Sequence, residues 1–256
     1  MEIKTRAYVL RATDYKENDK LLTLFSLEYG KLTATLRGVK KPKAKFKFAC
    51  QPFSLIEFVM AEKGGYYTVT QAQAIDAFFP LTADVEKFYA VSVMAQALME
   101  TLQEKQQDIP LFTNFGHTLG AMVYEKTDAK LMLTHFLSQL LLREGWGVGF
   151  SHCALCKQKL ETAYFSLAEG GCFCKAHAKA SAVQLKEEVF ALLCAVENAS
   201  VHHLVGMRCS VESARGALRL LADDFMERTG VSLPTLNEYF NLFLALQKKG
   251  EEENEN

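Results

Sequence analysis

Cys153-Ala154-Leu155-Cys156 and, after a short insert, Cys174-Lys175-Ala176-His177 form the stretch around which this chain is organised. A Cys-x-x-Cys turn and a Cys-x-x-His turn can each aim two ligands at a single point. Two such turns separated by a short insert are typical of a structural zinc site. The sequence therefore predicts a Zn²⁺ ion held by Cys153, Cys156, Cys174 and His177, with no open coordination position.

Other uses of these cysteines fit less well. Seven cysteines are an odd number, and nothing in the chain indicates secretion, so a disulfide pair is disfavoured. A histidine ligand makes an iron–sulfur centre the minority choice. Cys172 could replace Cys174 in the ligand set, but Cys174 repeats the spacing of the first pair and is preferred. His152 is interpreted as a neighbour of the site.

The insert between the two ligand pairs has its own pattern. Residues 162–167 alternate weakly between polar and apolar side chains, and Gly170-Gly171 follows them. The insert is long enough for a small β-hairpin, in which the glycines supply the tight turn. We therefore expect a hairpin that brings the second ligand pair back to the first.

Length and composition limit the class of protein. The chain has 256 residues, of which 49% are hydrophobic, so it can bury a core and is expected to hold more than one domain. Its 29 basic and 30 acidic residues nearly balance, so nucleic-acid affinity requires local segregation of charge. Without a signal peptide or a long apolar run, we expect a soluble cytoplasmic protein, associated with the nucleoid if it binds DNA.

The first eighty residues predict a β-barrel. Five short runs are alternating or β-branched, and turn residues separate them. They are residues 7–10, 21–25, 32–36, 53–59 and 66–69. Five strands in so short a segment favour an OB-fold over residues 1–80. An SH3-like barrel remains the alternative, because periodicity does not separate the two.

A basic loop lies between the third and fourth predicted strands, in a segment without acidic residues. Its candidate DNA-binding residues are Arg37, Lys40, Lys41, Lys43, Lys45 and Lys47. On an oligonucleotide-binding barrel, such a loop can follow the phosphates, and Phe46 or Phe48 could stack on bases. The alternatives are that the lysines form an ordinary solvated face and that the two aromatic side chains anchor the loop in the core.

From residue 82 the apolar period changes to that of a helix. Helical patterns fill residues 81–148 and resume over 181–247, and Asp128 is placed to cap one of the helices. The chain is thus expected to be α+β: a barrel, then a helical bundle interrupted by a zinc-binding insert at 149–180. Residues 248–256 are charged and are expected to form a disordered tail.

This order of barrel, helices, Cys-x-x-Cys insert and helices resembles the RecO family of bacterial recombination mediators. The resemblance covers nearly the whole chain to about residue 246. One departure is that zinc-bearing members tend to end in a second Cys-x-x-Cys, where this chain has Cys174-x-x-His177. The matching stretches include residues 19–25, 28–31, 37–46, 51–53, 164–166 and 170–171.

The resemblance implies a non-enzymatic protein of recombinational DNA repair. Such proteins bind single- and double-stranded DNA, anneal complementary strands and act with RecR. Together they help to load RecA onto DNA coated by single-stranded DNA-binding protein (SSB), whose acidic C-terminal tail they contact. The residues themselves indicate no catalytic motif. An enzyme would need an open zinc position, and a zinc-ribbon RNA-binding or transcription-linked adaptor remains the second alternative.

Overall fold

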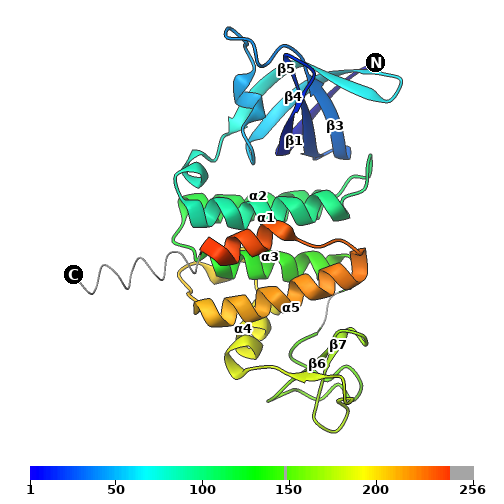
Figure 1. Ribbon diagram of the computed structural model, residues 1–256, viewed down its shortest axis with the longest axis vertical. Helices are drawn as coiled ribbons and strands as arrows, with labels where there is room; N and C mark the ends of the chain where they lie inside the picture. Colours follow the sequence, from blue (N-terminus) through cyan, green and yellow to red (C-terminus); the bar gives the residue numbers. More distant parts are fainter. Residues whose placement is uncertain (147–148, 243–256) are drawn as a thin grey trace, which may run out of the picture. The chain divides into compact units, whose positions relative to one another are not determined.

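The structure is a computed structural model that describes residues 1–146 and 149–242 (Figure 1). Two compact units make up the chain. The first joins Met1–Asp84 to Ala95–Leu119, and the second joins Val85–Met94 to the residues from Gly120 onward. The domain boundaries expected after residues 80, 148, 180 and 247 stay predictions.

The N-terminal strands close into a five-stranded barrel in the order β1-β2-β3-β5-β4, with β4 pairing back to β1. Strands β3 and β5 run parallel, and the other neighbouring pairs run antiparallel. This topology confirms the predicted OB-fold. The strands are β1 (Glu2–Tyr15), β2 (Asp19–Ser26), β3 (Gly30–Leu36), β4 (Leu55–Lys63) and β5 (Tyr66–Asp76).

Side chains along each barrel strand alternate between the interior and the surface, and those that point inward fill the barrel. Leu22, Leu24, Ile56 and Phe58 have no exposed surface and belong to a single core cluster. Burial of one such side chain contributes roughly 1.5–3 kcal/mol, so the inward positions set the register of each strand. Short 3₁₀ helices η1 (Lys47–Cys50) and η2 (Phe79–Thr82) follow strands β3 and β5.

Residues 95–119 belong to the same unit as the barrel and include parts of α1 (Val85–Thr101) and α2 (Ile109–Tyr124). The ring of Tyr8 on β1 lies 4.7 Å from that of Phe112 and 5.1 Å from that of Phe115, measured between centroids. Gly116 permits this approach, because a Cβ there would lie 2.2 Å from the Tyr8 hydroxyl. An aromatic cluster thus joins this helical segment to the barrel.

The second unit is mainly helical. Helix α3 is buried along most of its length and packs against α4 and α5. The predicted cap is confirmed, since the Asp128 carboxylate accepts the N–H groups of Lys130 and Leu131. The helices are α3 (Ala129–Arg143), α4 (Glu187–Glu197), the 3₁₀ helix η3 (Val201–Leu204) and α5 (Val211–Thr229).

A three-stranded sheet is inserted between α3 and α4, in the order β7-β6-β8. Strands β6 and β7 form the expected hairpin, and Gly170 turns between them with φ 57°. Its strands are β6 (Tyr164–Ser166), β7 (Gly171–Phe173) and β8 (Val183–Gln184).

Within the helical segment expected over 181–247, a further helix is present over 234–242, where the described chain ends. The rest of that segment and the predicted tail at 248–256 lie outside the described residues. In the part of the chain that the structure describes, no helix combines the length and the apolar character needed to cross a bilayer.

Candidate metal centre and nucleic-acid interface

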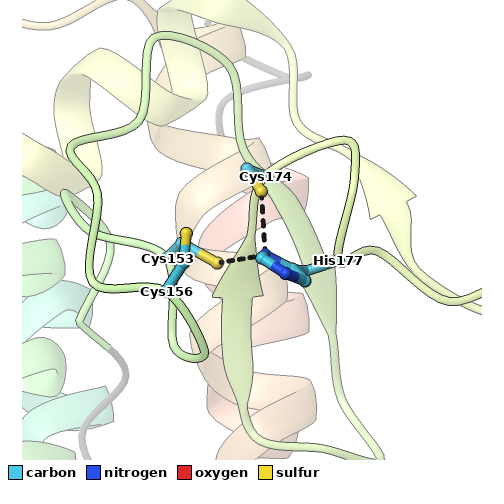
Figure 2. Close-up of side chains that lie close together, drawn as sticks. All are labelled: Cys153, Cys156, Cys174 and His177. Carbon is cyan, nitrogen blue, oxygen red and sulfur yellow. Dashed lines mark hydrogen bonds between the residues drawn. The ribbon is translucent and has the colours of Figure 1, made fainter.

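Two tight backbone turns deliver the four predicted metal ligands. In the first, the Lys157 N–H donates to the Cys153 carbonyl over 2.9 Å, and Lys157 takes a left-handed φ of 61°. In the second, the His177 N–H donates to the Cys174 carbonyl over 3.0 Å, directly after β7. Figure 2 shows the side chains of both turns converging on one point.

The ligand atoms of Cys153, Cys156, Cys174 and His177 all lie within 4.8 Å of one another. The Nδ1 atom of His177 is 3.2 Å from the Cys174 sulfur and 3.7 Å from the Cys153 sulfur (Figure 2). Tetrahedral ligands about 2.3 Å from zinc are separated from each other by about 3.8 Å. The group can therefore hold one metal ion, and its S₃N donor set is one that zinc accepts.

Hydrogen bonds around Cys153 favour the thiolate form of its side chain. Burial acts to raise its pKa, but backbone hydrogen bonds at Cys156, Cys174 and Leu155 outweigh burial and lower the pKa to about 6. A thiolate is the form that ligates metal, so a thiol with a lowered pKa binds with less competition from protons.

The two neighbours that the sequence left open lie outside this group. Cys172 has no exposed surface, and burial raises the pKa of its thiol to about 12, with Cys194 and Glu197 as smaller causes. His152 is exposed, and its Nδ1 lies 3.0 Å from the Ser151 hydroxyl. The geometry thus favours Cys174 over Cys172 as the third sulfur ligand.

Contacts from α4 and α5 hold this insert, and sequence reasoning missed them. The Glu197 carboxylate accepts the N–H groups of Phe150 and Ser151 at 3.1 and 3.2 Å. A Cβ at Gly170 would lie 2.1 Å from the guanidinium of Arg228, which itself donates to the buried Asp224 over 3.3 Å. These partners are distant in sequence, so no local pattern indicates them.

In the basic loop of the barrel, Arg37, Lys40, Lys41, Lys43, Lys45 and Lys47 are all exposed. Lys40 forms an ion pair with Asp14 at 2.9 Å, and Lys20 forms another at 3.2 Å. Hydrogen bonds from Lys40 and then Lys20 lower the pKa of Asp14. Lys47 donates to the Pro42 carbonyl over 3.0 Å and begins η1. The loop therefore presents a basic surface whose charge at Lys40 is partly offset.

Of the two aromatic residues of the loop, one anchors the loop in the core and the other is free to stack on a base. Phe46 is partly buried and packs against the barrel core. Phe48 is 39% exposed, and its ring lies edge-on to that of Phe46 with centroids 6.3 Å apart. Phe46 thus anchors the loop, and Phe48 is accessible to a base.

A hollow of about 400 Å³ on the barrel adds residues that the sequence did not single out. Tyr15, Tyr66, Lys31 and Lys105 are among its lining residues, and Tyr66 is 81% exposed. Exposed rings beside cations suit the bases and phosphates of a single strand. The barrel residues meet here because the barrel closes, and β-bridges from Glu104 to Gly30 and Lys31 bring Lys105 beside them.

Comparisons with known proteins cover almost all of the described chain. Residues 1–78 match the family model described as Recombination protein O N terminal, and residues 82–236 match Recombination protein O C terminal. Three similar proteins are each named DNA repair protein RecO. That of Clostridium novyi (strain NT) is 28% identical over 239 residues, 93% of each chain.

The second, from Caldanaerobacter subterraneus subsp. tengcongensis, is 31% identical over 68% of this chain and 70% of its own. The third, from Oceanobacillus iheyensis, is 25% identical over 98% of this chain and 99% of its own. The similarity therefore spans the barrel, the helices and the metal-ligand insert together.

Proposed function

Because the chain belongs to the Recombination protein O (RecO) family, we propose that it binds and anneals DNA strands as a non-enzymatic recombination mediator. Membership makes it a protein of DNA repair and recombination. The observation that carries the DNA-binding proposal is the exposed basic loop on a closed OB-fold barrel. Loops and strands of this fold commonly bind oligonucleotides.

The loop provides affinity without sequence preference. Lysines that neutralise phosphates release counterions, and the gain in entropy is the same for any base sequence. The hollow beside Tyr15 and Tyr66 offers π-faces on which bases of any kind can stack. Together, the loop and the hollow provide a surface for single-stranded DNA. Duplex DNA would contact mainly the charged loop.

Replacing Lys41, Lys43 and Lys45 together by Gln is expected to weaken single-strand binding roughly 100-fold at 0.1 M salt. Each phosphate contact on a single strand contributes about 0.7 to the slope of log K against log salt concentration, so the slope should fall by about 2. Oligo-dT binding measured by fluorescence anisotropy across a salt series checks both values.

The control triple Lys126→Gln, Arg143→Gln and Arg208→Gln removes the same charge from exposed positions outside the barrel. It should leave the slope within experimental error of the unaltered protein. An equal loss of affinity in both triples would mean that net charge, rather than the loop, governs binding.

The partners proposed for this protein follow from its family. We infer that it acts with RecR and helps RecA to replace SSB on single-stranded DNA. Annealing of complementary DNA strands separates this function from that of a zinc-ribbon RNA-binding adaptor, which has no reason to pair them. Zn²⁺ is the proposed metal, and four protein ligands around it leave no position for catalysis.

For the acidic SSB tail, the helical unit offers a hollow of about 170 Å³ between α5 and residues 232–240. Leu233, Leu236 and Phe240 give it apolar walls, and the exposed Arg219 and Asp223 lie at its side. A C-terminal peptide with an apolar end needs such a pocket beside a cation. Lys130, another cation of the helical unit, is instead paired with Glu86 and Asp128 at 3.3 and 3.1 Å.

Arg219→Glu is therefore expected to weaken binding of an SSB tail peptide about tenfold, since one hydrogen bond to a charged group contributes on the order of 1.5–3 kcal/mol. Isothermal titration calorimetry of the peptide into the full chain measures the loss. Arg208→Glu, with the same charge change on another surface, is the matched control. Equal weakening in both variants would show that this hollow does not bind the tail.

A further inference from the structure

The metal-ligand insert segregates its charge. Its two ligand-bearing segments, residues 151–160 and 171–180, contain lysines but no aspartate or glutamate. The acids of the insert, Glu161 and Glu169, belong to the hairpin region between them. All lysines of the insert are exposed: Lys157, Lys159, Lys175 and Lys179.

The ligand geometry gathers these lysines. Lys157 directly follows Cys156, and Lys175 lies between Cys174 and His177. Because the four ligand atoms lie within 4.8 Å of one another, the two lysines flank the same centre from different segments. Lys159 is held near the first turn by a β-bridge to His152.

The lysines around the metal centre carry more positive charge than is needed to neutralise it. Zn²⁺ with three thiolates and a neutral imidazole carries a charge of about −1. Four lysines against two glutamates and this centre leave the insert, residues 149–180, at about +1, and Lys179 is already paired with Glu169. Of the other three lysines, none forms an ion pair within the described residues, and one of them would be enough to neutralise the centre.

We propose that this basic surface around the metal centre, with Lys157 and Lys175 at its middle, binds the phosphate backbone of a second DNA strand. The proposal rests on the DNA-binding function proposed for the barrel and adds a separate site in the other compact unit. A phosphate backbone requires only a row of accessible cations.

An acidic peptide would fit this surface less well. Such a ligand also needs an apolar pocket for its end. The apolar side chain between the first two ligands, Leu155, is 64% exposed, too open to enclose the end of a peptide. It can contact sugars and base edges of a strand held by the neighbouring lysines.

Two surfaces on one chain, each binding one DNA strand, would explain how the protein anneals DNA. When one strand is held by the barrel and another by the insert, their encounter becomes intramolecular. The effective concentration of a tethered site is commonly in the millimolar range. Complementary strands then meet far more often than they do free in dilute solution.

The test compares Lys157→Glu/Lys175→Glu with the control Lys126→Glu/Arg208→Glu, which changes the charge equally at exposed positions outside the insert. Two differently labelled, non-complementary dT oligonucleotides report a doubly loaded protein by energy transfer. Mass spectrometry reports metal content. In the insert variant we expect unchanged metal content and first-strand affinity within about twofold of the control.

Binding of the second strand should fall about 25-fold at 0.1 M salt, because each lost phosphate contact on a single strand is worth about fivefold there. The annealing rate should fall with it. Equal second-strand binding in both variants would overturn the proposal. If the unaltered protein binds one strand only, this proposal alone fails; if it binds none, the proposed function fails too.

Discussion

Protein carrying Cys174→Ser is expected to lose its metal, whereas protein carrying Cys172→Ser keeps it. Structural zinc sites of this kind contribute about 10–16 kcal/mol, and an even share among four ligands is about 3 kcal/mol, or more than a hundredfold in affinity. Cys174 belongs to the converging ligand group, and the fully buried Cys172 does not.

Metal content per chain, measured by inductively coupled plasma mass spectrometry after dialysis against a weak chelator, checks this result. Hydrogen exchange should then show faster exchange in the hairpin β6–β7 of Cys174→Ser, because metal binding and folding of such inserts are coupled. The barrel core is a separate cluster and should keep its protection. A metal-free Cys172→Ser together with a loaded Cys174→Ser would reverse the ligand assignment.

Gly30→Ala is expected to lower the free energy of unfolding by about 3 kcal/mol. Gly30 has a φ of 63°, and a Cβ there would lie 2.0 Å from the carbonyl oxygen of Gln106. The left-handed conformation costs a residue with a side chain roughly 1–2 kcal/mol, and relieving the overlap costs a similar amount. The backbone cannot easily retreat, since the Lys31 N–H donates to the Gln103 carbonyl over 3.2 Å.

Thermal unfolding followed by circular dichroism should show a midpoint about 10 °C lower for this variant. Gly64→Ala is the matched control, because Gly64 has a φ of 60° and nothing within 4 Å of its Cβ position. It carries only the conformational cost and should lose about 1 kcal/mol. Equal losses in the two variants would show that the contact with Gln106 does not matter.

Much of the fold was determined by local pattern. Alternation with a period of two, broken by turn residues, predicted five strands because each inward side chain adds its own burial energy. Asp128 could be recognised as a helix cap because its oxygen reaches N–H groups only two and three residues away. The ligand pairs were equally visible, since a Cys-x-x-Cys turn brings its two sulfurs together by local geometry.

The tertiary structure decided the questions that depend on long-range contacts. Cys172 and Cys174 are two residues apart, but β7 ends at Phe173, so Cys172 is buried within the strand and Cys174 lies in the turn that follows, beside His177. Asp14 offsets the charge of Lys40 across 26 positions of sequence. The hollow beside Tyr66 and the hydrogen bond from the Phe150 N–H to Glu197 likewise depend on segments that are distant in sequence. Such pairings depend on how the whole chain closes, because spacing along a sequence carries no information about distances between remote side chains.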